Sequence, residues 1–314
     1  ERLKMFLDIN PDKIGTIRGG KYKPSGGIDV ATIQSLIKQN TVDDIVAEYG
    51  QIIVDECHHL SAVSFESVIR ACKAKYVLGL TATATRKDGH QPIIFMQCGP
   101  IRYKVDAKKQ AKLRLFCHKV IVKNTAFNHN FLEEPKPSIS KIYAEIISDH
   151  QRNRIIIEDV LCVLKLGHSP LILTERKEHA AYFAQYLSGF CKNVVLMVGG
   201  QSTKELAFIR EKLATTPDNE ERLIIATGRY IGEGFDDGRL DTLFLTMPIS
   251  WHGTLAQYAG RLHRAHQRKK EVVIYDYVDY QIPMLARMAE KKMRGYTKLG
   301  YVLSNTVSDL SVQT

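Results

Sequence analysis

The chain has 314 residues, 44% of them hydrophobic, which is enough to form two ordinary domain cores. Its 44 Lys and Arg residues against 34 Asp and Glu give a net charge of +10, which suits a polyanionic partner. The six cysteines include no C-x-x-C pair, so they indicate reduced thiols rather than a disulfide framework or a zinc site. Without a bilayer-spanning run or a secretory leader, we expect an intracellular protein, cytoplasmic or nucleoid-associated, with no membrane partner.

Short apolar runs alternate with helix-periodic stretches along the chain, a pattern that predicts βα units around a parallel sheet. Strands are expected first at 29–33, 51–56 and 76–83, with a helix at 60–74. A second series follows, with strands at 170–175, 193–199, 222–228, 241–248 and 271–278 and helices near 176–188, 203–214 and 253–264. The expected fold class is therefore α/β, with parallel sheets flanked by helices.

A polar stretch with two prolines and no sustained periodicity separates the two series. The second domain is expected to open at a long helix over 141–167, and a helix rich in Met, Lys and Arg is expected from about residue 281. We therefore divide the chain into a first domain, a linker, a second domain and a C-terminal helix with its tail, at 1–124, 125–139, 140–280 and 281–314.

Residues 15–22 read GTIRGGKY, which matches the first seven positions of the phosphate-loop pattern G-x-x-x-x-G-K-[ST]. The eighth position needs a hydroxyl close to the backbone to hold Mg²⁺, and Tyr22 carries its phenol far out on a ring. Turn-forming residues follow at 23–27, where a phosphate loop would run into a helix. The sequence therefore predicts an ordinary strand and turn here.

The run IIVDECHHL is an apolar strand that ends in Asp55 and Glu56. Carboxylates at the carboxyl end of a parallel strand stand in the crevice where such sheets bind ligands. Asp55 would hold Mg²⁺, and Glu56 would orient or deprotonate the water that attacks a γ-phosphate. The alternative is a charged strand end in contact with solvent. Cys57 and the histidines after it are not expected to bind zinc, because no further ligands lie at zinc spacing.

The run LGLTATATRKDGH is a strand followed by small hydroxyl residues. The run Thr81-Ala82-Thr83 offers two threonine hydroxyls that can bond His58 and the acidic pair, and the run would so couple nucleotide state to domain movement. Threonine is common in strands, so this run gains meaning from following the acidic strand by one helix.

The segments DECH, TAT, ATGRYIGEGFD and QYAGRLHR occur in that order and resemble motifs II, III, V and VI of superfamily 2 helicases. The run DECHHL…LGLTAT…RKDG is similar to the XPB-like group, with type I and type III restriction translocases as near relatives. The resemblance covers about residues 1–280. It implies two RecA-like domains with ATP and Mg²⁺ as cofactors and nucleic acid as partner, DNA being favoured over RNA.

The resemblance also implies roles for matching residues. Asp55, Glu56 and His58 would belong to the catalytic group, while the nucleic-acid backbone would be touched by Thr32, Gln34, Thr227 and Gly228. The nucleotide would be approached by Gly232, Gly234, Asp236 and Gln257.

Gln257, Arg261 and Arg264 are spaced i, i+4, i+7, which on a helix places them on one face. Arg261 and Arg264 would then act as arginine fingers, the alternative being a surface ladder of ion pairs. The basic stretch that continues through Arg268, Lys269 and Lys270 is expected to be either a phosphate-contact surface or a solvated face.

The family places its phosphate loop ahead of everything seen here, and this chain contains no G-x-x-x-x-G-K-[ST] match. We therefore expect an N-terminally truncated first domain, a partner segment upstream that carries the loop, and a fragment inactive alone. The expected parent activity is that of an ATP-dependent DNA helicase. The alternatives are a duplex DNA translocase of a restriction-type system and a nucleic-acid-binding scaffold that has lost ATPase activity.

Overall fold

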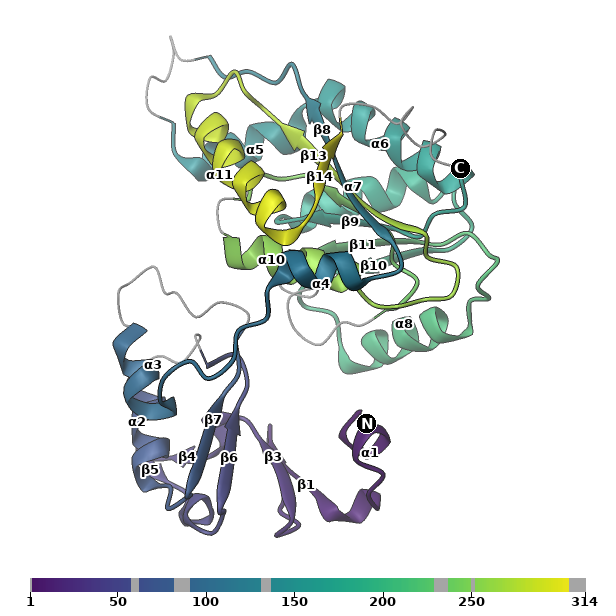
Figure 1. Ribbon diagram of the computed structural model, residues 1–314. Helices are drawn as coiled ribbons and strands as arrows, with labels where there is room; N and C mark the ends of the chain where they lie inside the picture. Colours follow the sequence, from purple (N-terminus) through teal and green to yellow (C-terminus); the bar gives the residue numbers. More distant parts are fainter. Residues whose placement is uncertain are drawn as a thin grey trace. The chain divides into compact units, whose positions relative to one another are not determined.

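The computed structural model describes residues 2–57, 62–81, 91–130, 137–228, 237–249 and 252–304. The chain forms two compact units, Glu1–Lys104 and Val105–Thr314 (Figure 1). Each unit has its own hydrophobic core. In the described part of the chain, no helix combines the length and apolar character that crossing a bilayer requires.

The first unit contains short helices and short strands, and the strands form three small sheets. Its elements are α1 (Arg2–Leu7), η1 (Pro11–Lys13), β1 (Ile14–Arg18), β2 (Lys21–Lys23), β3 (Ile28–Ala31), η2 (Ile33–Ser35), β4 (Ile37–Lys38), β5 (Thr41–Val42), η3 (Asp44–Ala47), β6 (Gln51–Val54), α2 (Ala62–Ala71), β7 (Tyr76–Gly79) and α3 (Gln91–Cys98). The sheets have the strand orders β2-β1-β3, β4-β5 and β6-β7.

The phosphate-loop lookalike GTIRGGKY forms a hairpin. β1 and β2 pair antiparallel, with Arg18 opposite Lys21. Gly19 and Gly20 make the turn with φ angles of +48° and +81°, a region that glycine enters without steric cost. The prediction of strand and turn at this position is confirmed.

Among the residues that the structure describes, the parallel pair β6–β7 is packed on one face only. On that face Val54, together with Cys57, joins a core that α2 and α3 complete through Phe65 and Ile94. The opposite face consists of apolar side chains that are 43% to 58% exposed: Ile53, Tyr76, Leu78 and Leu80. Parallel sheets are normally covered on both faces, so this surface is unusual.

The second unit is a seven-stranded parallel sheet between two layers of helices (Figure 1). Its elements are α4 (Ala107–Leu113), β8 (Cys117–Asn124), α5 (Ile139–Ser148), α6 (His150–Lys165), β9 (Pro170–Thr174), α7 (Lys177–Leu187), β10 (Val194–Met197), α8 (Thr203–Thr215), β11 (Leu223–Thr227), β12 (Thr242–Leu245), α10 (His252–Leu262), β13 (Glu271–Val278), α11 (Pro283–Leu299) and β14 (Val302–Ser304). The strand order is β10-β11-β9-β12-β13-β8-β14, and every pair is parallel.

Side chains of the central strands alternate between two cores. In β13, Val272 and Ile274 pack with α8, α10 and α11, whereas Val273, Tyr275 and Tyr277 pack with α6 and α7. This burial on both faces explains why the strands are nearly continuous apolar runs in the sequence.

The domain division differs from the predicted one. β8 pairs with β13 along its whole length, from Cys117–Glu271 to Asn124–Val278, so it belongs to the second unit rather than to a first domain ending at residue 124. α11 and β14 also pack within the second unit. Part of the predicted linker, 131–136, lies outside the described residues. These long-range pairings leave no signal in the local sequence.

The long helix predicted over 141–167 is two helices. Asp149 has extended backbone angles, ends α5 and begins α6, where its carboxylate accepts a hydrogen bond from the Arg152 N–H. Aspartate is a preferred N-cap residue, so the break has a local cause.

Candidate functional site

The predicted acidic pair lies in a tight turn at the carboxyl end of β6. Asp55 is exposed and Glu56 is partly buried. The Asp55 Oδ1 atom accepts a hydrogen bond of 2.9 Å from the Glu56 N–H. Glu56 has a φ of +47°, a left-handed conformation that costs a non-glycine residue about 1 kcal/mol or more. Strain of this kind is characteristic of functional turns and supports the assignment of a site here.

The acidic turn is tied to the end of β7. The Leu80 N–H donates to the Val54 carbonyl at 2.8 Å, and the Cys57 N–H donates to the Leu80 carbonyl at 3.0 Å. The hydrogen bonds between β6 and β7 therefore continue beyond the ends of both strands. They place Thr81, which follows Leu80, beside the acidic turn. The remaining predicted members of this group, His58, Ala82 and Thr83, lie outside the described residues.

A glycine on β7 allows the turn to pack closely, and sequence reasoning missed it. A Cβ on Gly79 would lie 3.1 Å from the Cys57 Sγ and 3.0 Å from the Cys98 Sγ. Burial, with a smaller contribution from Cys98, raises the pKa of the Cys57 thiol to about 11. The thiol therefore remains protonated and acts as packing beneath the acidic turn rather than as a nucleophile.

The acidic turn offers a donor set of the kind that Mg²⁺ uses. Mg²⁺ keeps several of its waters and binds through one or two carboxylates together with substrate phosphates. Asp55 and Glu56 provide two adjacent carboxyl groups at a strand end, Asp55 exposed. Among the described residues no three metal-ligating side chains come together, so an all-protein cage is not present there. The donor set fits a hydrated ion that a nucleotide would share.

Thr32 and Gln34 lie in the turn that follows β3. Both are exposed, and the hydroxyls of Thr32 and Ser35 share a hydrogen bond of 2.8 Å. Ile33 between them packs against the core beneath β6. The predicted contact residues therefore face solvent on an anchored turn.

In the second unit, the predicted contact residue Thr227 ends β11, and Gly228 follows it in a crowded position. Thr227 is only 8% exposed. A Cβ on Gly228 would overlap the Tyr258 hydroxyl oxygen and lie 2.9 Å from the Glu175 Oε1 atom. Tyr258 donates a long hydrogen bond of 3.5 Å to Glu175. Sequence reasoning did not identify this packing partner, although Tyr258 stands one residue after Gln257.

Glu175 is the carboxylate of this group. The residue reaches the surface at the end of β9, yet desolvation of its carboxyl group raises its pKa above the ordinary value. The same desolvation, with the negative charge of Glu175, raises the pKa of Tyr258 well above 10, so the phenol stays protonated. The Tyr258 hydroxyl can therefore donate to Glu175 only because residue 228 has no Cβ.

The prediction that Gln257, Arg261 and Arg264 share a helix face is wrong for Arg264. α10 ends at Leu262, and Arg264 lies two residues beyond it. The His263 N–H bonds the Gly260 carbonyl in a tighter i→i+3 turn, which closes the helix. Gln257 and Arg261 are partly buried on α10, and Arg264 is exposed.

Lys269 holds this helix end. Its ammonium group donates to the carbonyls of Leu262 and Arg264, both at 2.8 Å, and the residue is only 7% exposed. Burial lowers its pKa to about 8. The expectation that Lys269 contributes to a phosphate-contact surface or a solvated face is therefore wrong, because its charge is used inside the fold.

Two histidines, His118 buried and His263 half-buried, lie next to the same turn. His263 Nε2 and the Tyr301 hydroxyl share a hydrogen bond of 2.8 Å, and the His118 and His263 rings meet edge to face at 4.9 Å. Arg114 approaches His118 Nε2 at 3.3 Å. Burial, with the positive charge of Arg114, lowers the pKa of His118 to about 4 and that of His263 to about 3. Both rings are therefore neutral near pH 7.

A buried ion pair joins the carboxyl ends of the central strands. Arg152 Nε donates to Asp279 at 2.9 Å, and its Nη1 donates to the Thr246 carbonyl at 2.7 Å. Thr125 also bonds Asp279. Since α6, β8, β12 and β13 meet through these groups, the edge that carries Thr227 is rigidly held.

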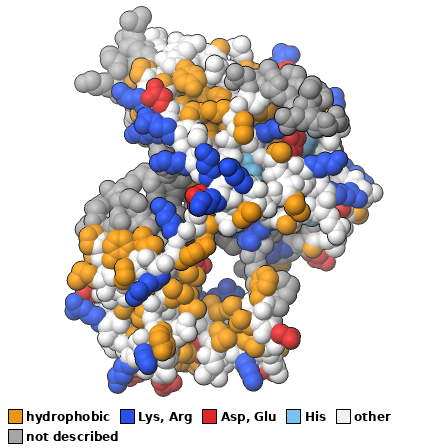
Figure 2. Space-filling model, viewed as in Figure 1, with side chains coloured by type: hydrophobic (Ala, Val, Ile, Leu, Met, Phe, Trp, Pro, Cys, Tyr) orange, Lys and Arg blue, Asp and Glu red, His pale blue; other side chains and the backbone are white. Residues whose placement is uncertain are grey.

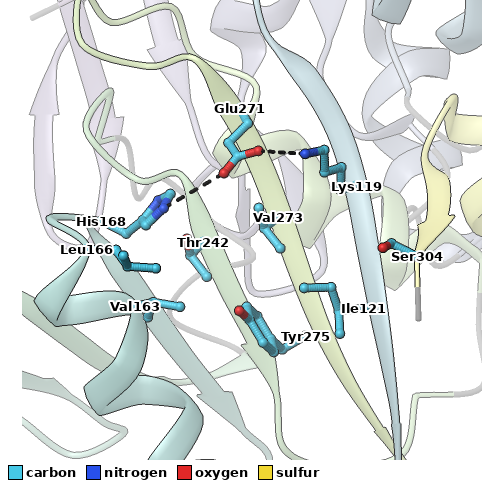
Figure 3. A pocket seen from close by; sticks show the side chains of 10 residues that line it. All are labelled: Lys119, Ile121, Val163, Leu166, His168, Thr242, Glu271, Val273, Tyr275 and Ser304. Atoms are coloured by element: carbon cyan, nitrogen blue, oxygen red, sulfur yellow. Dashed lines mark ion pairs between the residues drawn. The ribbon is translucent and has the colours of Figure 1, made fainter. Parts of the chain in front are cut away.

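A pocket opens at the opposite edge of this sheet (Figure 3). Glu271 lies there between Lys119, at 3.1 Å, and His168, at 3.8 Å. His168 also bonds Asp241, which raises the pKa of the ring. These residues precede or begin their strands, whereas open parallel sheets bind ligands at the carboxyl ends. We therefore assign this cluster a structural role.

Comparison with known proteins finds relatives that are named as helicases or translocases. Residues 1–86 match the family described as type III restriction enzyme, res subunit. A putative ATP-dependent RNA helicase of Acanthamoeba polyphaga mimivirus is 26% identical over 307 residues, covering 94% of this chain and 56% of the relative. A probable helicase of Escherichia phage T5 is 22% identical over 312 residues, covering 95% and 64%. A DNA 3'-5' translocase, XPB2, of Sulfurisphaera tokodaii is 32% identical over 111 residues, covering 35% and 24%.

Solved structures share the fold. A fragment of a putative HsdR subunit of a type I restriction enzyme from Vibrio vulnificus superposes with a TM-score of 0.65 at 15% identity, covering 96% of this chain and 56% of that one. S. cerevisiae Dbp5 bound to RNA and ADP BeF3 gives a TM-score of 0.57 at 11% identity, covering 94% of this chain and 71% of that one.

The fold is thus that of a two-unit RecA-like α/β protein. In sequence the chain is similar to proteins named as helicases and, over residues 1–86, to a restriction-enzyme subunit family. It spans about 56% and 64% of the length of the first two relatives. The predicted residues Gly232, Gly234 and Asp236 lie outside the described residues.

Proposed function

We propose that the protein is an ATP-dependent helicase or translocase that acts on nucleic acid. The observation that carries this proposal is the strained acidic turn at the carboxyl end of β6, where Asp55 and Glu56 follow a parallel strand. A turn with two adjacent carboxylates, next to the Thr81 end of β7, suits the cleavage of a phosphoanhydride bond by water.

Each charged residue has a proposed role. Asp55 would hold Mg²⁺, which when bound neutralises charge on the phosphate oxygens of ATP. Glu56 would accept a proton from the attacking water. Arg261 and Arg264 are proposed to stabilise the negative charge that develops on the γ-phosphate. The turn held by Lys269 supports the role of Arg264, since a guanidinium group that contacts phosphate needs a fixed backbone.

The uncovered face of β6–β7 supports the proposal of a further segment with the phosphate loop. A strand–loop–helix unit could pair its strand with this small sheet and cover Ile53, Tyr76, Leu78 and Leu80 with its helix. Such a unit would also bring backbone N–H groups at the helix start to the acidic turn. We propose that without it this chain binds ATP weakly and hydrolyses little.

The nucleic-acid partner is proposed to be DNA. The local identity of 32% to a DNA translocase supports this choice, and the longer match to a protein named as an RNA helicase makes RNA the alternative to be tested. Thr32 and Gln34 are proposed contacts because they are exposed on an anchored turn. An intracellular location follows from such a substrate.

The test is nucleic-acid-stimulated ATP hydrolysis by the full-length protein. Glu56→Gln should lower kcat by about 10²- to 10⁴-fold while ATP affinity changes less than about threefold, because only proton acceptance is lost. Glu66→Gln is the matched control, since Glu66 lies on α2 of the same unit and pairs with Arg70 at 2.6 Å. An unchanged rate in Glu56→Gln would remove Glu56 from the role of base.

Running the assay with single-stranded DNA, duplex DNA and RNA separates the substrates. Strand displacement and triplex displacement on the same preparation separate unwinding from duplex translocation. A full-length protein that binds nucleic acid and never hydrolyses ATP would instead support a scaffold.

A further inference from the structure

A single row of cations runs along α11 in the second unit. Arg287, Lys291, Arg294 and Lys298 are exposed and spaced i, i+4, i+7 and i+11. At about 100° per residue these positions fall within an arc of about 60°, and the row is about 16 Å long. Glu290 is the only acidic residue of the helix.

α4 adds to this row. It contacts α11, and a Cβ on Gly300, at the end of α11, would lie 2.7 Å from the Ala111 Cβ. The α4 side chains of Lys108, Lys109 and Lys112 are exposed. Figure 2 shows Lys and Arg side chains gathered over α4 and α11. We call the row of four on α11 with these three lysines the basic surface. Among the described residues no ion pair joins any of the seven to a carboxylate.

The opposite face of α11 fixes the row in place. Lys292 donates to Asp276 Oδ1 at 2.5 Å, and the Tyr296 hydroxyl donates to Asp276 Oδ2 at 2.9 Å. All three side chains are buried, and Leu285 packs in the core beside α5. The cations therefore stand on a rigid support, which reduces the entropy lost when they bind a partner.

We infer that the basic surface binds the phosphodiester backbone of nucleic acid, as a contact additional to the motif residues of the strand ends. This rests on the proposed function. A duplex strand carries one phosphate per 3.4 Å of axis, so a 16 Å row faces about five phosphates. Repeated charge of one sign on a straight element is complementary to such a backbone and reads no base sequence.

Two other partners fit the surface less well. A membrane-surface helix inserts its apolar face, and the apolar face of α11 is already buried in the protein. A protein partner is normally anchored by large apolar side chains, and no such residue of α11 is among the exposed ones.

The test measures the salt dependence of binding. The variant Arg287→Gln/Lys291→Gln/Arg294→Gln is compared with the control Lys165→Gln/Lys204→Gln/Arg210→Gln, which removes the same charge from exposed positions on α6 and α8. Glutamine is a good helix former, so both variants should fold. The probes are a fluorescein-labelled 30-nucleotide oligo(dT) and a 30-base-pair duplex, titrated by anisotropy between 50 and 300 mM KCl.

We expect the α11 variant to bind at least about 10-fold more weakly at 100 mM KCl. The slope of log K against log salt should fall by about 2.7 for the duplex and about 2.1 for the single strand, since three phosphate contacts are lost. The control should stay within twofold of the unmodified chain. A larger effect on the duplex than on oligo(dT) would identify duplex as the ligand, and the reverse would identify single strand.

Several results would overturn the inference. One is an α11 variant with the affinity and salt slope of the unmodified chain; if ATP hydrolysis still responds to nucleic acid, the proposed function survives. A second is equal loss in the control, which would mean a general charge effect. A third uses polyglutamate as an additional probe: if the α11 variant loses polyglutamate binding and keeps DNA binding, the partner is an acidic protein. An unmodified chain that binds neither probe would overturn the inference and the choice of DNA as the substrate.

Discussion

Substitution of Gly228 by alanine tests whether the end of β11 is as crowded as the structure shows. The new Cβ would overlap the Tyr258 hydroxyl and lie 2.9 Å from Glu175 Oε1 and 3.2 Å from Tyr258 Cζ. Tyr258 is 5% exposed on α10 and packs in the main core, so it cannot simply swing away. Overpacking of this kind costs about 1–3 kcal/mol.

For a unit of about 200 residues, each kcal/mol lowers the Tm by about 2–4 °C, so we expect Gly228→Ala to melt roughly 3–10 °C lower. The matched rescue is Tyr258→Phe, which removes the overlapping oxygen and leaves a ring carbon at a tight but tolerable 3.2 Å. Alone, Tyr258→Phe should cost less than about 1 kcal/mol, because the bond it loses is a long one of 3.5 Å.

The assay is urea unfolding of the wild type, both single variants and the double variant, followed by circular dichroism. The loss of unfolding free energy in the double variant should be smaller than the sum of the two single losses by about 1 kcal/mol or more, because both substitutions act on the same clash. If Gly228→Ala unfolds at the wild-type midpoint, or if Tyr258→Phe gives no rescue, the crowding deduced for this strand end is incorrect.

Two further predictions concern buried charge. Lys292→Met should lower the free energy of unfolding in urea by about 3–5 kcal/mol, because it leaves Asp276 buried with only Tyr296 as partner. The control Lys291→Met, on the exposed face of the same helix, should change it by no more than about 0.5 kcal/mol. Equal effects of the two substitutions would contradict the pairing of Lys292 with Asp276. The free energy of unfolding should also fall as pH drops from about 6.5 towards 4. The pKa values of His118, His179 and His263 are lowered to about 4, 3 and 3, so in the folded state these rings do not take up the protons that the unfolded chain binds near pH 6.5. His179 is fully buried on α7, and desolvation is the main cause of its lowered pKa. Replacing His179 by glutamine should flatten the dependence of stability on pH, and an unchanged slope would argue against it.

Local patterns were sufficient to predict β9 to β13 and the helices α7, α8, α10 and α11, because buried parallel strands are apolar runs and the helices between them are periodic. They did not indicate α4, β8, β14 or the break between α5 and α6. The hairpin at 15–22 was also predictable, since Tyr22 and the turn residues after it are incompatible with a phosphate loop. The acidic turn could be located because charges rarely end an apolar strand without cause.

Other features depended on contacts between distant residues. The pairing of β8 with β13 joins segments more than 150 positions apart, so the sequence alone placed this strand in the wrong domain. The end of α10 before Arg264 is set by Lys269, whose charge reads as part of a basic run until its burial is seen.

The sequence by itself determined the fold class, the order of the motifs and the acidic residues of the first unit, because periodicity and residue chemistry are local properties. Only the tertiary structure decided which polar groups are buried with partners inside the fold and which face solvent. Lys269 and Lys292 are buried with partners, while the cations beside Lys292 form an open row on α11. That difference arises from packing against strands far away in the chain, which no local pattern records.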